Sequence, residues 1–526
     1  MNQETSTTPG EALANVKAVP LVSPPSALRP RNRPAVALAD LFPGAGPERV
    51  HGITLDSRLV LPGDLYVALP GRHHHGAEFT SAAVAAGAAA VLTDPAGARL
   101  IAGTSVPVVV VDDPRQAMAA TAASIYGRPA DAMTMYAVTG TNGKTTTSFL
   151  LDSALRAGGV RTGMVGTIGY FLDGGPLAST RTTVTTPEAT ELQGLLGYLQ
   201  EQGATAVVME VSSHALALGR ADAVVFATAA FTNLGRDHLD FHSDEEAYFE
   251  AKASLFTPER TRHAVVNVDD PRGRQLAERV VRNGRVELTT VGLGGTTDVA
   301  ALDCDLRADG RTAVRARLRS RPLTFTLGLP GAFNVRNAIT ALAMVEITGG
   351  DVEAAAAGLA EASVPGRMQR VDLGPDAPVV YVDFAHTPQA VAAALEAVGS
   401  RRRIAVLGCG GDRDPEKRRP MGAAAARHAD LVVVTDDNPR SEDPAAIRAE
   451  VLAGARAAGG SAEVVDGGDR RSAIRLALQQ ARARDVVAVL GKGHELGQEV
   501  GGAVLPFRDA DVVAAEWAGL GGEGER

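Results

Sequence analysis

The stretch from Tyr136 to Thr147, YAVTGTNGKTTT, contains the residue types that bind a nucleotide phosphate. Backbone N–H groups of a glycine-containing loop can hold phosphate oxygens at a helix N-terminus, and a lysine adds positive charge. The usual phosphate loop reads G-x-x-x-x-G-K-[ST], and Val138 stands where its first glycine belongs. The sequence therefore predicts a shortened loop, with Lys144 on the phosphates and the Thr145 hydroxyl on Mg²⁺. The alternative is an ordinary glycine turn before a helix.

Three further side chains could serve a metal ion beside that loop. Glu210 ends the apolar run AVVME, and the carboxyl ends of parallel strands face the same crevice as a phosphate loop. A solvated glutamate at a strand end is the alternative. His238 follows another apolar run, although Mg²⁺ prefers oxygen ligands. Spacing alone favours a structural role for Lys252, in which its methylene chain lies along an apolar helix face and its ammonium is in water.

Two other stretches superficially resemble known kinds of site, a histidine metal site and a dinucleotide-binding loop. His73, His74 and His75 are consecutive, so their side chains do not converge on one ion in regular structure. The stretch LGCGGDRD resembles a dinucleotide-binding loop, but Arg413 breaks the G-x-G-x-x-G pattern at its third glycine. The sequence thus argues against a histidine metal site and against a nicotinamide dehydrogenase.

The elements that position these residues alternate between apolar strands and helices. A strand over 133–140 leads into the phosphate loop, a helix starts near Thr145, and another spans 188–202. Further apolar runs precede Glu210, the 231–238 stretch and, later, DFAHTP, GCGGDRD, DDNPR and GKGHE. This alternation is typical of parallel sheets wrapped by helices. We expect an α/β fold.

Composition limits the classes of protein that remain. The 526-residue chain is long enough for about three domains. Its formal net charge is −9, which argues against a general nucleic-acid binder. Cys304 and Cys409 are its only cysteines and form no disulfide framework. Apolar runs are far shorter than the ~20 residues of a membrane span, and no signal peptide is evident. We expect a cytoplasmic protein that is not inserted in a membrane.

A dozen motifs occur together in one order, and as a set they resemble the Mur ligase family. They are DSR with PGDLYVAL, GTNGKTT, TTPE, MEVSSHAL, FTNLGRDHLD, AKASLF, GAFNVRNA, PGRMQRV, DFAHTP, GCGGDRD, DNPR and GKGHE. The resemblance implies a three-domain architecture, in which a central phosphate-loop ATPase domain with a parallel sheet is flanked by two others. The expected ranges are a disordered tail over 1–35, a UDP-binding α/β domain over 36–130, the ATP-binding domain over 131–365, and a Rossmann-like amino-acid-binding domain over 366–526.

The resemblance also implies roles for particular residues. It overturns the first reading of Lys252, because that position matches a lysine carbamylated by CO₂ (N6-carboxylysine), which carries oxygen to a metal ion. The implied catalytic residues are Lys144, Lys252, Glu210 and His238. The implied metal ligands are Thr145, Glu210, His238 and Lys252. The implied ATP-binding residues are Gly140, Thr141, Asn142, Gly143, Lys144, Thr145, Thr146, Asn267, Asp269 and Arg367. The implied UDP-muramoyl-dipeptide contacts are Leu55, Ser57, Thr185, Thr186, Ser212 and Arg220.

The implied reaction is an ATP- and Mg²⁺-dependent ligation in peptidoglycan synthesis. A carboxylate of UDP-N-acetylmuramoyl-L-alanyl-D-glutamate is phosphorylated to an acyl phosphate, and the amine of diaminopimelate attacks it, leaving ADP and phosphate. Arg440 suits the far carboxylate of diaminopimelate because its planar fork donates two charge-assisted hydrogen bonds. Asp437 and Asn438 are expected to receive the far ammonium and Arg413 another carboxylate. The implied diaminopimelate-binding residues are Arg413, Asp437, Asn438, Pro439, Arg440, Gly491 and Glu495.

Two rival functions share the phosphate loop. A switch or motor protein would use the nucleotide to change shape, but a GTPase would need an N-K-x-D motif, which the sequence lacks. A folylpolyglutamate synthase would use the same kind of phosphate loop and lysine. It has no reason to carry DNPR or the N-terminal DSR and PGDLYVAL unit.

Overall fold

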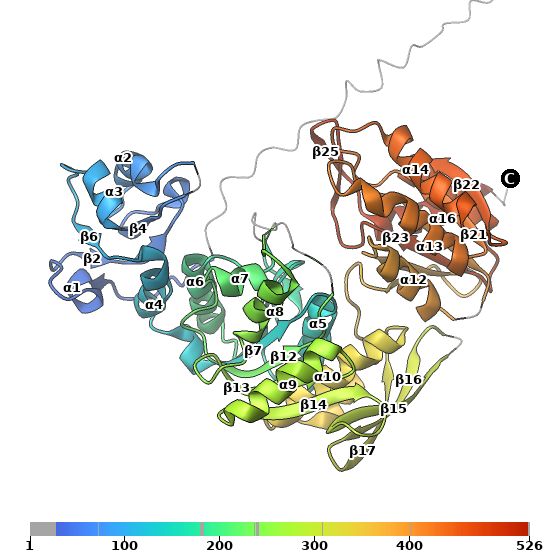
Figure 1. Cartoon of the computed structure of the whole chain (residues 1–526), viewed down its shortest axis with the longest axis horizontal. Helices are drawn as coiled ribbons and strands as arrows, with labels where there is room; N and C mark the ends of the chain where they lie inside the picture. The colour runs from blue at the N-terminus through green and yellow to red at the C-terminus, as the bar shows by residue number, and fades with distance from the viewer. Residues whose placement is uncertain are drawn as a thin grey trace, which may run out of the picture.

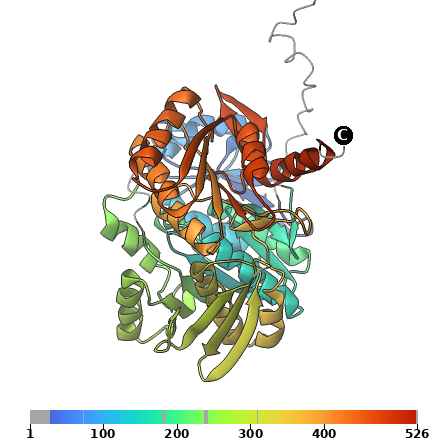
Figure 2. The same cartoon turned by 90° about the vertical axis from the view of Figure 1, so that its right-hand side faces the viewer.

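The computed structural model describes residues 28–71, 73–178, 184–235, 237, 241–307, 309–399 and 401–523. The described chain folds around three main sheets (Figure 1). In the view turned by 90° about the vertical axis, the C-terminal sheet is seen above the central one (Figure 2). The predicted α/β fold is confirmed. No helix in the described part of the chain is both long and apolar enough to cross a bilayer.

The first sheet is small and wholly parallel. Its strands, in spatial order, are β3 (Gly52–Thr54), β4 (Asp64–Ala68), β5 (Ala90–Thr93) and β6 (Val108–Val110). Around it lie α1 (Leu38–Leu41), α2 (Thr80–Ala85), α3 (Pro95–Leu100), α4 (Pro114–Ile125), the 3-10 turns η1 (Ser57–Leu59) and η2 (Gly76–Phe79), and the short pair β1 (Val36–Ala37) and β2 (Arg49–Val50). The next turn, η3 (Pro129–Ala132), already packs in the central unit, where Ala130 is part of a buried cluster. Residues 1–27 of the predicted tail lie outside the described residues. Residues 28–35, which were expected to belong to that disordered tail, are bound to the central unit. The backbone N–H groups of Arg31 and Asn32 donate to the Glu201 carboxylate.

The central sheet carries the phosphate loop. Its strands, in spatial order, are β10 (Gly175–Pro176), β9 (Gly169–Leu172), β8 (Thr162–Gly166), β11 (Ala206–Glu210), β7 (Thr134–Thr139), β12 (Phe226–Phe231), β13 (Thr261–Asn267), β14 (Glu287–Leu293), β15 (Val299–Leu306), β16 (Thr312–Leu318) and β17 (Arg321–Leu327). The strands from β8 to β15 run parallel, and antiparallel strands extend both edges.

Helices cover both faces of this sheet because its strands are apolar on both sides. Tyr136 and Val138 of β7 belong to one buried cluster, whereas Met135 and Ala137 point into another, as the two-residue period of a strand requires. The first cluster includes α5 (Lys144–Ala157), α10 (Ala332–Ile347) and α11 (Val352–Gly358). The second includes α6 (Ala189–Glu201), α7 (Ser213–Ala217), α8 (Glu245–Ala253) and α9 (Pro271–Asn283).

The third sheet is also built on parallel strands. In spatial order they are β18 (Gln369–Val371), which is antiparallel, then β19 (Val379–Asp383), β23 (Val486–Leu490), β20 (Arg403–Leu407), β21 (Leu431–Thr435) and β22 (Glu463–Gly468). Its helices are α12 (Pro388–Ala397), α13 (Arg418–His428), α14 (Pro444–Ala457), α15 (Arg470–Gln480) and α16 (Asp509–Glu523), with the turn η4 (Pro415–Lys417). The hairpin of β24 (Gly497–Val500) and β25 (Ala503–Pro506) forms a separate two-stranded sheet, and Val500 makes a bridge to Arg440 in the loop after β21.

Several helices start where the sequence provides a capping side chain followed by proline. The side chains of Thr387 and Asp443 accept backbone N–H bonds at the first turns of α12 and α14, and each is followed by proline. Proline at the first helical position has no N–H that would go unpaired, and its backbone angle already suits a helix. The polar loops therefore end at fixed points, which holds their side chains at the carboxyl ends of the strands.

Candidate active site

The phosphate loop lies between β7 and α5, as the sequence predicts. A side chain at Gly140 would overlap the Thr232 hydroxyl, and one at Gly143 would lie 2.8 Å from Oδ1 of Asn337. Both glycines have positive φ angles, so the tight path of the loop requires them. The loop is consequently pressed against the ends of the neighbouring strand and of α10, with its backbone turned toward the start of α5.

Lys144 folds back across this loop. Its Nζ donates to the carbonyl oxygens of Gly140 and Thr141, each at 2.9 Å. Burial lowers the pKa of Lys144, the carboxylates of Glu210 and Asp237 oppose that shift, and the Arg367 guanidinium adds to it. The positive charges of Lys144 and Arg367 are thus close enough to act on each other, beside a loop suited to phosphate.

Glu210 reaches the loop from the adjacent strand. Glu210 on β11 is the register partner of Val138 on β7, and it is 1% exposed. The Thr145 hydroxyl donates to Oε2 at 2.9 Å. Thr167 donates its backbone N–H to Oε1 and its hydroxyl to Oε2, both at 2.9 Å. The structure therefore brings the expected ligands Thr145 and Glu210 together, and it adds Thr167, which the sequence gave no reason to select.

Lys252 is buried against the same loop. Its side chain is 1% exposed, its Nζ donates to the Gly140 carbonyl at 2.9 Å, and it lies 4.5 Å from the centre of the Tyr248 ring. Burial and the neighbouring Lys144 ammonium hold the pKa of Lys252 well below its ordinary value, while the Asp237 carboxylate opposes the shift. The interpretation from spacing alone, an ammonium in water, is wrong.

The fourth expected metal ligand is His238. His238 lies outside the described residues, together with Leu239 and Asp240. Among the residues that the structure describes, no group of three or more histidine, cysteine or acidic side chains is arranged to hold a metal ion. The oxygens of Thr145 and Glu210 are of the type that Mg²⁺ prefers.

The residues expected near adenosine and phosphates lie around the loop. Asn267 ends β13 and donates to the Thr232 carbonyl at 2.6 Å. Asp269 accepts from Arg336 at 2.8 Å and from the Leu293 backbone at 2.9 Å. Arg367 stacks on Phe384, with its guanidinium carbon 4.3 Å from the ring centre. Burial lowers the pKa of Arg367, and Asp383, Glu210 and Glu495 oppose that shift.

A polar cluster joins the Glu210 strand to the expected dipeptide contacts. Thr186 donates its hydroxyl to the Glu210 carbonyl at 2.8 Å and accepts from the Ser212 backbone at 3.2 Å. Arg220 donates to Glu188 at 2.9 Å and to the Thr186 carbonyl at 3.2 Å. Glu188 was missed as a separate residue although it closes the TTPE motif.

The other expected dipeptide contacts are divided between two sheets. The Thr185 hydroxyl lies 3.1 Å from that of Thr167, on the central sheet. Leu55 follows β3 and Ser57 begins η1, so both lie at the carboxyl end of the N-terminal sheet. The structure thus brings Thr185 to the Glu210 group, whereas Leu55 and Ser57 belong to the N-terminal sheet.

The expected amino-acid residues gather at the carboxyl ends of β21 and β23. Asp437 is packed so closely that a side chain at Gly491 would lie 2.5 Å from its Oδ2. Arg440 donates from Nε to Glu499 and from Nη1 to the Gly411 carbonyl, both at 2.7 Å. Pro439 precedes it, and Arg440 has a φ of +53°. Arg413 is exposed on the adjoining loop.

Asn438 is bonded to the protein through both atoms of its amide group. Its Oδ1 accepts from Lys492 at 2.9 Å and from the Glu499 backbone at 3.0 Å, and its Nδ2 donates to Glu495 at 2.8 Å. The oxygen that was expected to receive an ammonium is therefore occupied. Lys492 and Glu499 were not selected from the sequence, although Lys492 lies inside the GKGHE motif.

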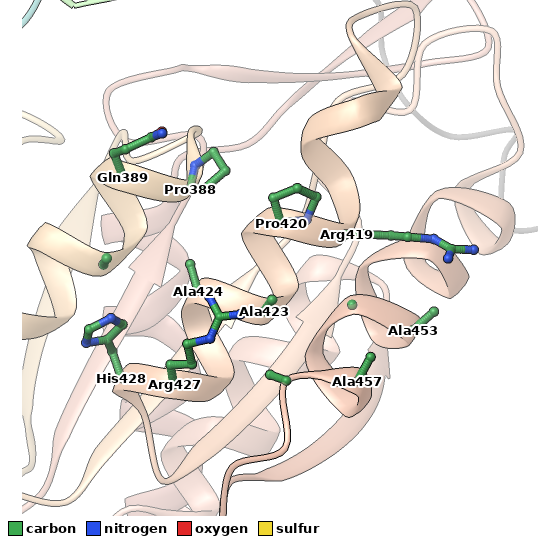
Figure 3. Close-up of a pocket in the computed structure, with 13 residues that line it drawn as sticks. Pro388, Gln389, Arg419, Pro420, Ala423, Ala424, Arg427, His428, Ala453 and Ala457 are labelled. Carbon is green, nitrogen blue, oxygen red and sulfur yellow. The ribbon is translucent and has the colours of Figure 1, made fainter.

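A groove on the C-terminal unit is separate from this site. It measures about 590 Å³ and lies between α12, α13 and α14, where Figure 3 shows it. Its lining contains alanines with Arg419, Arg427 and His428. None of the sequence-predicted site residues that the structure describes lines it.

A shortened phosphate loop on a parallel sheet, with a second sheet presenting charged loops toward it, defines a nucleotide-dependent α/β enzyme. Three family models match the chain: the Mur ligase family catalytic domain over 49–126, the Mur ligase middle domain over 138–345, and the Mur ligase glutamate ligase domain over 366–493. The chain belongs to the Mur ligase family, and the expected three-domain architecture is that family's.

Named relatives match nearly the whole chain. The UDP-N-acetylmuramoyl-L-alanyl-D-glutamate–2,6-diaminopimelate ligase of Streptomyces coelicolor is 46% identical over 93% of this chain and 97% of its own. A solved structure of a UDP-N-acetylmuramoyl-L-alanyl-D-glutamate–2,6-diaminopimelate ligase has a TM-score of 0.68 at 33% identity, covering 93% of this chain and 99% of its own. The MurF ligase of Thermotoga maritima in complex with ADP shares the fold, with a TM-score of 0.59 at 19% identity over 89% and 97%.

Proposed function

We propose that this protein is an ATP-dependent ligase that joins 2,6-diaminopimelate to UDP-N-acetylmuramoyl-L-alanyl-D-glutamate in peptidoglycan precursor synthesis. Family membership and the named relatives support the reaction class. The observation that carries the amino-acid assignment is the cluster of polar residues at the ends of β21 and β23, in which Arg440 is held by Glu499 and Gly411. A buried carboxylate without a partner is costly, so a site selective for diaminopimelate must supply such a cation.

The chemistry needs an activated carboxylate, because joining a carboxylate and an amine in water is unfavourable. We infer that the γ-phosphate of ATP passes to the D-glutamyl side-chain carboxylate, giving an acyl phosphate and ADP. The amine of diaminopimelate then attacks the acyl carbon, and phosphate leaves as the amide forms. Phosphoryl transfer depends mainly on positioning and charge neutralisation, which suits Lys144 and the loop over Gly140–Thr146.

The same residues fit a magnesium ion. Thr145 and Glu210 present oxygens 2.9 Å apart at the loop, and Lys252 is buried beside them. We propose that these residues and His238 would hold Mg²⁺, with Lys252 carbamylated so that it contributes oxygen. When bound, the ion would neutralise phosphate charge. The structure gives Lys252 two features that suit this modification, a position against the Gly140 carbonyl and exclusion from water.

Arg440 tests the amino-acid assignment. Arg440→Ala and Arg440→Lys should both raise the KM for diaminopimelate, by roughly 10-fold to 100-fold, since a lysine cannot reproduce the fork of two donors. The KM for ATP should not change, because the phosphate loop lies on another sheet. Steady-state phosphate release measures both. If Arg440→Lys kept the wild-type KM for diaminopimelate, the assignment of Arg440 to its far carboxylate would be wrong.

A further inference from the structure

Lys492 is a buried lysine whose ammonium bonds to oxygens of the protein itself. It follows β23 in the stretch GKGHE, and its side chain is 1% exposed. Its Nζ donates to Oδ1 of Asn438 at 2.9 Å, Oε2 of Glu495 at 2.7 Å and the Gly497 carbonyl at 2.7 Å. An ammonium has three N–H groups, and all three are used. Lys492 therefore acts on the walls of the amino-acid pocket.

These bonds fix which way the amide of Asn438 points. Its oxygen faces the Lys492 ammonium and the Glu499 backbone N–H, and neither of those groups can accept a hydrogen bond. The amide nitrogen must therefore point to the other side. One of its N–H groups bonds to Glu495, and the other has no acceptor in the hydrogen bonds of the described residues. Asn438 thus offers the pocket a donor.

Glu499 links this amide to Arg440. Its backbone N–H bonds to the Asn438 oxygen, and its carboxylate accepts from Nε of Arg440 at 2.7 Å. The backbone N–H of Arg440 in turn donates to the Glu499 carbonyl at 3.0 Å. Glu499 therefore holds two hydrogen-bond donors in place, the Asn438 amide and the Arg440 guanidinium. Acceptors remain at Asp437 and Glu495.

We propose that Lys492 is a positioning residue that turns the Asn438 amide nitrogen into the pocket, so that Asn438 and Arg440 together bind the far carboxylate of the amino-acid substrate. The far ammonium is left to the oxygens of Asp437 and Glu495. The inference rests on the proposed function, because it concerns the far end of diaminopimelate. It reverses the expectation that Asn438 receives the ammonium.

Lys492→Met removes the three donors and keeps a side chain of similar length. The Asn438 oxygen then keeps only the bond from the Glu499 backbone, and Glu495 loses its cation. Both side chains are held less firmly, so the KM for diaminopimelate should rise roughly 10-fold to 100-fold. The KM values for ATP and for UDP-N-acetylmuramoyl-L-alanyl-D-glutamate should stay unchanged. ADP formed in a single turnover without any amino acid should also stay unchanged. Arg419→Met, on the outer groove of the same sheet (Figure 3), is the control and should leave all these values at the wild-type level.

Asn438→Asp is the second variant and decides the matter should Lys492→Met fail to fold. It keeps the shape of the side chain and the bond from Lys492, but it replaces the donor with an oxygen. It should lower the preference for diaminopimelate over lysine, because lysine has no far carboxylate to be repelled. An unchanged preference in Asn438→Asp, or an unchanged KM for diaminopimelate in folded Lys492→Met, would overturn the inference. Failure of the wild type itself to use diaminopimelate would instead overturn the proposed function.

Discussion

Lys144 and Lys252 lie beside the same phosphate loop, but their surroundings differ.

 They both bond to the Gly140 carbonyl, each at 2.9 Å, but Lys144 has a second acceptor in Thr141 and is partly open to water. Lys252 is 1% exposed and lies beside the positive charge of Lys144. A buried cation with so little compensation is costly, whereas a carbamate at the same place would carry negative charge. The surroundings of Lys252 therefore favour its proposed modification.

Lys252→Ala tests that role. The variant should lose roughly 100-fold to 1,000-fold in kcat, because charge stabilisation at the phosphates is lost. Acetate or formate at high concentration should restore part of the activity, since a small carboxylate can occupy the space of the carbamate. Phosphate release with and without acetate measures this, and Lys144→Ala, which acetate should not restore, is the control. Intact-mass or crystallographic data showing an unmodified Lys252 in the active enzyme would contradict the proposal.

At the scale of elements, the packing of α13 on α14 holds the loops of the amino-acid pocket. A side chain at Gly422 would overlap the Val451 carbonyl, and one at Gly454 would overlap the Arg419 carbonyl, so the two helix backbones touch. At the start of α13, buried Arg418 donates to Glu442 at 2.8 Å, and the Asp412 backbone donates to the same carboxylate at 2.6 Å. The helix pair thereby ties the loop after β20 to the loop after β21.

Gly422→Ala should separate these helices. Inserting a methyl group into such a contact costs roughly 1–3 kcal/mol, because the backbone of α14 must move. The midpoint of thermal or urea unfolding should therefore fall. Gly519→Ala in α16 is the matched control: a side chain there has nothing within 4 Å, and alanine favours a helix over glycine. Equal midpoints for the two variants would show that the close contact of α13 and α14 does not contribute to stability.

The sequence predicted those parts of the site that follow from the order of strands and loops. Gly140, Lys144 and Glu210 were found because glycines and strand ends have fixed places in parallel sheets. Thr167 was not, because a threonine in a turn shows no sign of the carboxylate that it will meet. The four-residue spacing of Tyr248 and Lys252 gave the helix face but not what covers it. The orientation of Asn438 depends on Lys492, which is 54 residues away in the chain.

At the scale of the whole molecule, residues 28–33 join the N-terminal sheet to the central one. Arg29 donates to both carboxylate oxygens of Asp64, at 2.8 and 2.7 Å, and the Asp64 side chain is 2% exposed. Further along, Pro30 packs against α6, where a side chain at Gly197 would lie 3.0 Å from it. Figure 1 shows α6 beside the N-terminal unit. This segment therefore fixes the sheet that carries Leu55 and Ser57 relative to the phosphate loop.

Arg29→Leu tests this junction. It leaves the buried Asp64 carboxylate without its cation, which costs roughly 3–5 kcal/mol. The unfolding midpoint should fall, and the KM for UDP-N-acetylmuramoyl-L-alanyl-D-glutamate should rise while the KM for ATP is retained. Arg31→Leu changes an exposed side chain of the same segment and should leave these values at the wild-type level. A wild-type midpoint in Arg29→Leu would rule out a stabilising role for the ion pair.

The central claim is that one molecule uses ATP to join two specific substrates, and phosphate release tests it most directly. The measurement uses the full chain with ATP and Mg²⁺, adding UDP-N-acetylmuramoyl-L-alanyl-D-glutamate and an amino acid separately and together. Steady phosphate release should require both, diaminopimelate should serve far better than lysine, and folded Lys144→Ala should release none. Steady release without the UDP-linked substrate would contradict the ligase assignment, and equal or better use of lysine would contradict the claim of specificity for diaminopimelate.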